Sequence, residues 1–269
     1  MPLALLLAAQ LTYFVPPSDH ALRSPTPMAL QLVEAPFEDV RLGVTFTGTQ
    51  QRYARLRYGE ADSVRITAVT DVDESGHAAL YLDLNRDLAI TSDERVAPTQ
   101  NARAWEVSLT AVVRDALGQV TSVPRRLRFE LNGTGSILGA ATLGWLEGEV
   151  AVGEQTLRVR RRDLNLNGFF GDRGDQLWID RDGNGEWAPF GELYASLPFL
   201  TLPEAEGRVR YAVKSNRVGV QLQLAEASEV GTIEVALHSE AGHVRSDVRT
   251  LEALLIGRDG TVVSISQHA

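Results

Sequence analysis

The chain has 269 residues, of which 44% are hydrophobic and 23% are charged, and its formal net charge is −9. These proportions are those of a soluble globular protein, and the negative charge argues against nucleic acid as a partner. Because the sequence contains no cysteine, disulfides, thiolate metal sites and thiol catalysis are excluded.

The negative charge is concentrated in two segments. Residues 71–94 carry seven acids and one arginine, a net charge of −6, and residues 163–192 carry seven acids and two arginines, a net charge of −5. Together they carry −11, so the rest of the chain carries +2. Acidity that is local in this way is what cation sites require, and it does not describe a general acidic surface.

The N-terminus is an apolar run that extends to about Val15. It is too short to cross a bilayer, which takes ~20 apolar residues, but its length suits the hydrophobic region of a signal peptide. No Lys or Arg precedes the run and no clean A-x-A cleavage site follows it, so a buried N-terminal segment is the alternative. We expect a secreted or periplasmic protein of the bacterial exported type, with no membrane span.

Residues 1–36 comprise the apolar run and a proline-rich linker, and alternating hydrophobicity begins at Val40. Alternation with period two predicts strands. A first β unit is expected at 37–135, with strands at 40–47, 53–58, 63–70, 77–82, 105–113 and 125–131. A second is expected at 136–269, with strands at 149–152, 155–160, 176–179, 209–213, 218–224 and 231–237 and a hairpin of 251–256 with 261–265.

The chain shows no long amphipathic pattern with helix caps, and short helical turns are expected only at 91–95 and 188–195. The expected fold class is therefore mostly β, with antiparallel sheets in a sandwich or barrel-like arrangement. A weak internal repeat, in which Leu80-Tyr-Leu-Asp83 matches Leu177-Trp-Ile-Asp180, suggests that the two β units are similar.

Three acidic loops carry oxygen-bearing side chains at every second position. They are Asp83-x-Asn85-x-Asp87, Asp163-x-Asn165-x-Asn167-Gly168 and Asp180-x-Asp182-x-Asn184-Gly185, named here the first, second and third loops. Side chains spaced in this way around a glycine turn can converge on one hard cation, for which Ca²⁺ is the usual choice.

The three loops resemble the calcium-binding loops of EF-hand proteins, dockerins and thrombospondin type 3 repeats. The resemblance is local to the loops. It implies side-chain ligands at positions 1, 3 and 5, a backbone carbonyl at position 7, a bidentate carboxylate at position 12 and a glycine turn at position 6.

The resemblance assigns ligands to each loop, with one departure in each. The third loop supplies Asp180, Asp182, Asn184, the Glu186 carbonyl and Glu192, which lies one residue beyond position 12. The second supplies Asp163, Asn165, Asn167 and the Phe169 carbonyl, with Asp172 or Asp175 to complete the shell. The first supplies Asp83, Asn85, Asp87, the Ala89 carbonyl and Glu94, but it has Leu88 in place of glycine, so its turn is expected to differ.

Alternating strands precede the loops where an EF-hand has a helix, so strand–loop sites are expected and an opening switch is not. The alternative is that the loops are polar turns, since Asp, Asn and Gly are ordinary turn residues. For Asp71 to Ser75, a plain hairpin turn is favoured.

These features predict a non-enzymatic, exported protein that calcium stabilises. The alternative is a carbohydrate-binding or hydrolase accessory module with structural calcium, in which Tyr81, Trp178 and Trp187 beside the loops would stack on sugar rings. Packing in the core is the simpler role for these aromatics. A polysaccharide or another exported protein is the expected class of partner, and an enzyme whose reaction type the sequence does not specify is the third hypothesis.

Overall fold

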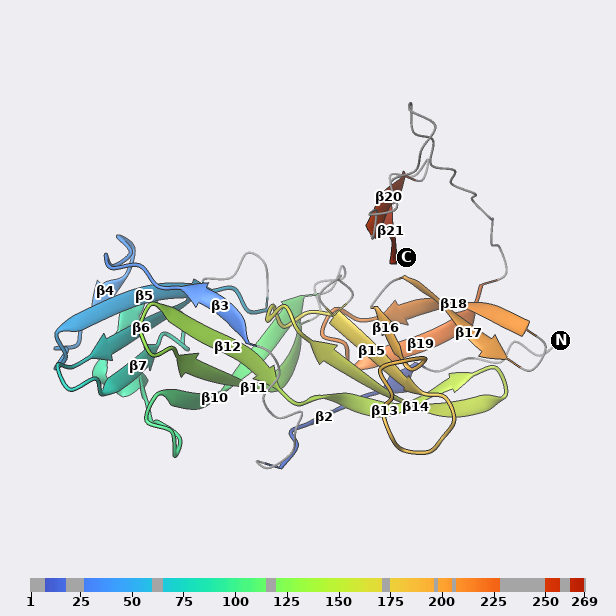
Figure 1. Ribbon diagram of the computed structural model, residues 1–269, viewed down its shortest axis with the longest axis horizontal. Coiled ribbons are helices and arrows are strands. Elements are labelled where there is room, and N and C mark those ends of the chain that lie inside the picture. The colour runs from blue at the N-terminus through green and yellow to red at the C-terminus, as the bar shows by residue number, and fades with distance from the viewer. Residues whose placement is uncertain are drawn as a thin grey trace. The chain divides into compact units, whose positions relative to one another are not determined.

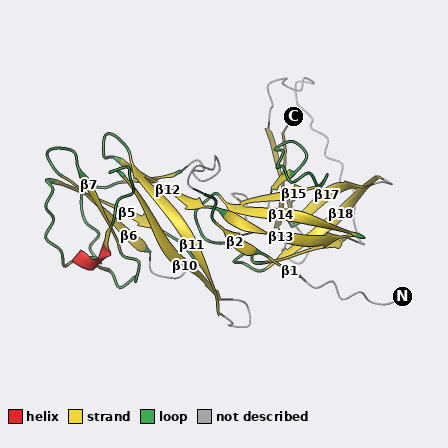
Figure 2. Ribbon diagram, turned by 90° about the horizontal axis from the view of Figure 1, so that it is seen from below, coloured by secondary structure: helices red, strands yellow, loops and turns green. Residues whose placement is uncertain are grey.

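Strands form most of the chain in the computed structural model (Figure 1), which describes residues 8–17, 27–59, 65–114, 120–170, 175–195, 198–204, 207–227, 250–256 and 262–268. The one helix among these residues is a short 3₁₀ helix, η2 (Ser92–Glu94), drawn red in Figure 2. The expected mostly β class is confirmed. No described helix is long and apolar enough to cross a membrane.

Two four-stranded antiparallel sheets enclose the first hydrophobic core. One has the order β10-β11-β12-β3 and the other the order β5-β6-β7-β9. Leu127 and Leu138 of the former and Ile66 and Leu80 of the latter are buried in the same cluster, which is sandwich packing. The strands are β3 (Met28–Gln31), β5 (Gln50–Leu56), β6 (Ile66–Val72), β7 (Ala78–Leu82), β9 (Arg95–Val96), β10 (Ala104–Arg114), β11 (Val120–Leu131) and β12 (Ile137–Leu143).

A second pair of antiparallel sheets encloses a second core. Their orders are β16-β15-β14-β13-β2 and β1-β19-β18-β17, and Val159, Ile179, Leu222 and Leu224 are buried together between them. These four sheets thus form two β-sandwiches. The strands are β1 (Ala9–Gln10), β2 (Thr12–Phe14), β13 (Trp145–Val152), β14 (Gln155–Asp163), β15 (Asp175–Asp180), β16 (Leu193–Ala195), β17 (Phe199–Glu204), β18 (Gly207–Ser215) and β19 (Gln221–Glu226).

The N-terminal segment belongs to this second sandwich. Strands β1 and β2 pair with β19 and β13, and Leu11 between them is only 2% exposed. Gly144 and Gly148 leave room for this segment, since a Cβ at Gly144 would lie 2.0 Å from the Phe14 carbonyl oxygen and one at Gly148 would lie 2.8 Å from Leu11 Cδ2. The end of the apolar run is therefore part of the core.

Two local predictions are wrong. The strand expected at 40–47 is reduced to β4 (Arg41–Leu42), which pairs in parallel with β8 (Ala89–Ile90). The helical turn expected at 188–195 is a turn followed by β16. The other expected turn is confirmed as η2, and the strand expected at 231–237 lies outside the described residues.

Residues 1–228 form one compact unit and residues 229–269 a second. The described part of the second unit is the hairpin of β20 (Thr250–Ile256) and β21 (Val262–His268). Its pairing confirms the hairpin expected there. The acidic loops all lie in the first unit.

Candidate metal centres

The three acidic loops share one backbone conformation. In each, the fourth and sixth residues have a left-handed backbone, a conformation in which side chains other than glycine are strained. At the fourth position φ is 61° for Arg86, 58° for Leu166 and 67° for Gly183, and at the sixth it is 62° for Leu88, 77° for Gly168 and 77° for Gly185. The altered turn expected at Leu88 is therefore absent, and at the sixth position this loop accepts strain that the other two avoid with glycine.

The loops also share their internal hydrogen bonds. The N–H of the sixth residue donates to the carboxylate of the first, at 3.2 Å from Leu88 to Asp83, 2.9 Å from Gly168 to Asp163 and 3.1 Å from Gly185 to Asp180. The N–H of the seventh residue donates to the side chain of the fifth in each loop, at 2.9, 2.8 and 2.6 Å. The alternating polar residues thus fold the backbone as well as offering oxygen atoms.

The third loop gathers three acids that could hold a metal ion. Asp180, Asp182 and Glu192 each place a carboxylate oxygen within 4.8 Å of the others. Asp180 is 1% exposed, and its Oδ1 has no hydrogen-bond donor among the described residues. A buried carboxylate oxygen without a donor is costly, and a cation would remove that cost.

Glu192 is fixed by the backbone of the same loop. Its Oε1 accepts a hydrogen bond from Arg181 N at 3.0 Å and its Oε2 accepts one from Ala188 N at 2.8 Å. Although it lies one residue beyond the twelfth position, Glu192 is therefore aimed at the loop. The remaining predicted ligands, Asn184 and the Glu186 carbonyl, belong to exposed residues on the outer turn.

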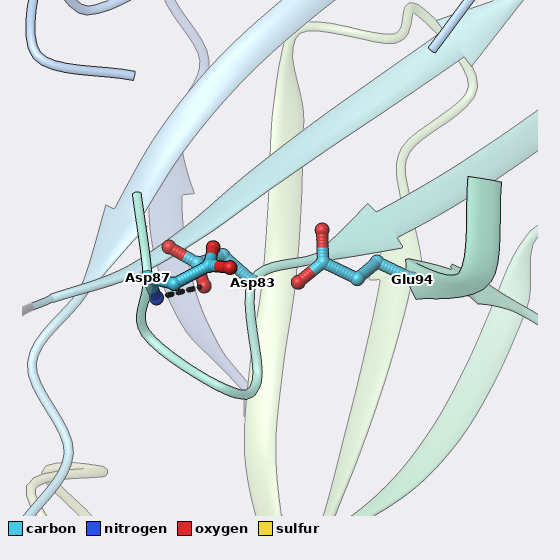
Figure 3. Close-up of side chains that lie close together, drawn as sticks. All are labelled: Asp83, Asp87 and Glu94. Carbon is cyan, nitrogen blue, oxygen red and sulfur yellow. Dashed lines mark hydrogen bonds between the residues drawn. The ribbon is translucent and has the colours of Figure 1, made fainter. Parts of the chain in front are cut away.

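The first loop gathers a second such cluster, Asp83, Asp87 and Glu94, with oxygens within 4.8 Å of one another. Asp83 is buried at the end of β7, and Glu94 reaches toward it from η2 (Figure 3). Glu94 Oε2 accepts a hydrogen bond from Thr91 N at 2.9 Å, whereas its Oε1 is buried without a donor among the described residues. The parallel β4–β8 pair holds the end of this loop, since Arg41 N donates to Leu88 O at 2.8 Å.

Burial and like charge oppose ionisation in the first loop. Burial raises the pKa of Asp83. Hydrogen bonds from backbone N–H groups lower it and the charge of the neighbouring Asp87 raises it, both more weakly than burial. Burial also raises the pKa of Glu94, and the charges of Asp83, Asp87 and Asp93 raise it further. A divalent cation would favour the ionised carboxylates in this loop.

Glu94 and Glu192 occupy equivalent positions relative to the strands that flank their loops. Glu94 immediately precedes β9, which returns to pair Arg95 with Tyr81 of β7. Glu192 immediately precedes β16, which pairs Leu193 with Trp178 of β15. Since Tyr81 and Trp178 each lie two residues before the first aspartate, the register places both glutamates opposite the residue that precedes the loop. The sequence repeat is thus also a repeat of strand pairing.

The second loop differs at this position. Its return strand is β15, and Gln176 pairs with Arg162, the residue that precedes Asp163. An amide therefore stands where the other two loops have a glutamate. Asp175 instead pairs directly with Asp163, and both are buried. Asp172, the other acid expected to complete the shell, lies outside the described residues.

Asp163, the first residue of the second loop, has a raised pKa. Burial raises its pKa to about 6, against hydrogen bonds from the backbone of the second loop and the charge of Arg125. Its Oδ1 accepts from Leu166 N at 2.8 Å, and Asn167 Oδ1 accepts from Phe169 N. Asn165, the remaining predicted side-chain ligand, lies between Asp163 and Asn167 in the sequence.

The third loop is attached to the sheet by Arg160 of β14. Arg160 lies with its guanidinium 4.1 Å from the ring centroid of Trp187 and 4.2 Å from that of Trp145. Its Nε donates to Glu147 Oε2 at 2.8 Å. Because side chains of a strand alternate between its two faces, Arg158, Arg160 and Arg162 lie on the same face of β14.

The aromatics beside the loops do not form an exposed row. Tyr81 is 4% exposed, Trp178 is half-buried, and the ring of Trp187 is covered by Arg160. The exposed ring in this region is Phe190, which is 93% exposed on the turn of the third loop.

No protein-family model matches the chain, and comparison with curated proteins and with solved structures finds no match.

Proposed function

We propose that this protein is a calcium-binding, exported, non-enzymatic β protein in which Ca²⁺ stabilises the loops that connect its strands. The observation that carries the proposal is Asp180 Oδ1, a buried carboxylate oxygen without a hydrogen-bond donor among the described residues, within a cluster that includes Asp182 and Glu192. A bound cation would supply the missing partner.

The chemistry of the ligands favours calcium. Both clusters offer carboxylate oxygens only, and the alternating residues add amide and carbonyl oxygens, which suits a hard cation. Calcium accepts irregular shells of six to eight oxygens, whereas magnesium demands a near-ideal octahedron. The irregular last ligand of the third loop therefore favours calcium, at the affinity of extracellular modules, ~10⁻⁴–10⁻³ M.

The position of the clusters supports a structural role. Each lies between a largely buried strand and a short edge strand that returns to it. A cation there would fix the edge strand as well as neutralise the loop, so its binding energy would add to folding stability. The carboxylates are tied to backbone N–H groups of their own loops, which supports a non-enzymatic protein.

Export agrees with this affinity, since calcium is abundant outside cells. The apolar N-terminal run supports export, but Leu11 of that run is buried in the second core. Cleavage that removed Leu11 would remove a core side chain, so a mature form should retain it. N-terminal sequencing of exported protein tests this directly, and a mature chain that begins after Leu11 would contradict it.

The carbohydrate-binding alternative has less support. Stacking on sugar rings needs exposed, coplanar aromatic faces, but Trp187 packs against Arg160 and Tyr81 is buried. A polysaccharide or protein partner stays a prediction.

Thermal unfolding in EDTA and in millimolar Ca²⁺ tests the proposal. Calcium should raise the Tm of the natural chain progressively over ~10⁻⁴–10⁻² M, as expected for a ligand that binds only the folded state. Asp180→Asn should lose part of this shift, whereas Glu226→Gln, which alters an exposed acid outside the loops, should keep it. A Tm that calcium leaves unchanged would refute calcium stabilisation.

A further inference from the structure

One peptide group joins the first and second loops. Its carbonyl, on Tyr58, accepts a hydrogen bond from Nη2 of Arg86 at 2.7 Å. Its N–H, on Gly59, donates to the backbone carbonyl of Asn167 at 2.7 Å. Arg86 is the fourth residue of the first loop and Asn167 is the fifth residue of the second. Two loops far apart in the sequence are thus bonded to the two ends of the same planar unit.

The contact is tight on the side of the second loop. A Cβ on Gly168 would lie 3.0 Å from Cε1 of Tyr58 and 3.1 Å from Gly59 N. Tyr58 itself is 2% exposed, and Gly59 has a left-handed backbone with φ of 89°. The peptide therefore packs against Gly168 with no room for a larger side chain, and a displacement of one loop is transmitted to the other through this contact.

Cation binding acts on the same peptide from the side of the first loop. Arg86 lies between Asp83 and Asp87, two acids of the first cluster, and it has a left-handed backbone with φ of 61°. A cation that draws these carboxylates together fixes the backbone of Arg86. The guanidinium is also repelled by the cation, which favours its bond to the Tyr58 carbonyl.

We propose that the Tyr58–Gly59 peptide couples the two loops, so that the packing of the second loop sets the calcium affinity of the first. The inference rests on the proposed function, because it concerns a calcium site. Coupling is reciprocal, so calcium in the first loop must also stabilise the second. Typical couplings change affinity by about 5-fold or more.

The test is calcium titration by calorimetry in a chain whose third loop is silenced by Asp180→Asn and Asp182→Asn. Gly168→Ala adds a Cβ against Tyr58 without removing a predicted ligand, and it should weaken calcium binding at the first loop about 5-fold or more. Gly135→Ala is the matched control, because Gly135 has a comparable φ of 70° with no atom within 4 Å of its Cβ position. It should leave the affinity unchanged.

Arg86→Met gives a second, independent variant. Removing a positive charge beside the acids should strengthen calcium binding if electrostatics alone acts, whereas loss of the bond to Tyr58 should weaken it. Arg95→Met, at an exposed arginine next to Glu94, measures the electrostatic effect by itself. We expect weaker binding for Arg86→Met, and an effect of Gly168→Ala that largely disappears in the double variant.

The outcomes separate the two proposals. The coupling is overturned if Gly168→Ala leaves the calcium affinity unchanged, or if Arg86→Met raises the affinity as Arg95→Met does. Either result leaves the proposal of calcium binding intact. A folded parent chain that takes up no calcium at all refutes calcium binding at the first loop, and the coupling with it. If circular dichroism shows that Gly168→Ala does not fold, the sign of the Arg86→Met effect decides.

Discussion

Leu88 and Gly185 occupy the sixth position of two separate loops, and both have a left-handed backbone, with φ of 62° and 77°. Leucine in this conformation costs about 1–2 kcal/mol, a cost that glycine does not bear. Leu88 keeps this conformation because its N–H donates to the Asp83 carboxylate and its carbonyl accepts a hydrogen bond from Arg41 N.

The strain at Leu88 predicts an unusual order of stability. Leu88→Ala and Leu88→Gly remove the same packing, but only glycine relieves the backbone. Leu88→Gly should therefore be more stable than Leu88→Ala by about 1 kcal/mol, the reverse of the order at ordinary positions. Urea unfolding in EDTA measures the difference, and equal stabilities would show that the loop relaxes away from this conformation.

The sequence predicts most of this fold because period-two alternation is visible wherever one face of a strand is buried. It also predicts the loops, because Asp, Asn and Gly at alternate positions favour turns and offer side-chain oxygen atoms. The strand β12 was missed because Gly139, Ala140 and Ala141 lack the β-branched and aromatic residues that mark strands. Only pairing with β11 and β3 specifies it.

Counting residues does not locate the last predicted ligand of each loop. Glu192 lies one position later than Glu94 relative to the first aspartate, yet the pairing of β16 and β9 with the preceding strand makes the two equivalent. The same pairing brings Gln176 to this position in the second loop. These relationships depend on long-range register, which no local pattern specifies.

The raised pKa of Asp163 predicts that stability in EDTA falls as pH rises. Its pKa is about 6 in the folded chain, against an ordinary value of 3.8, so protonation favours folding. This contribution is complete below about pH 4 and is lost as pH rises through about 6, and it amounts to about 3 kcal/mol at most. The difference in unfolding free energy between the natural chain and Asp163→Asn, measured from pH 4 to pH 7, isolates it.

Calcium extends this measurement to the second loop. If a cation binds Asp163, calcium will favour the ionised carboxylate and flatten the pH dependence. A slope that is the same in EDTA and in calcium would place the cations elsewhere. A natural chain and Asp163→Asn variant with parallel pH profiles in EDTA would contradict the raised pKa itself.

The buried N-terminal segment predicts a large effect of Leu11→Ala. Leu11 is 2% exposed within the second core, and truncating such a leucine costs about 2–5 kcal/mol. Thr12 follows it in the chain but is exposed, so Thr12→Ala should cost less than about 0.5 kcal/mol. Urea unfolding followed by circular dichroism compares the two, and similar costs would show that this segment does not pack as β1 and β2.

The contact of Arg160 with Trp187 predicts that the third loop depends on the outer face of β14. Arg160→Leu removes a guanidinium whose side chain is 13% exposed, and with it one of the two groups that donate to Glu147 Oε2 at 2.8 Å, the other being Trp145 Nε1. The expected cost is about 1–3 kcal/mol. Arg158→Leu is the matched control, because Arg158 is 44% exposed and 3.8 Å from the same glutamate, and it should cost less than about 1 kcal/mol.

Tryptophan fluorescence adds a readout that stability alone does not give. Because Trp187 belongs to the third loop and its ring lies on Arg160, calcium binding at Asp180 should change its emission in the natural chain. Arg160→Leu should reduce that change while calorimetry still detects calcium. An undiminished fluorescence change in Arg160→Leu would mean that the loop orders around its cation without help from the sheet.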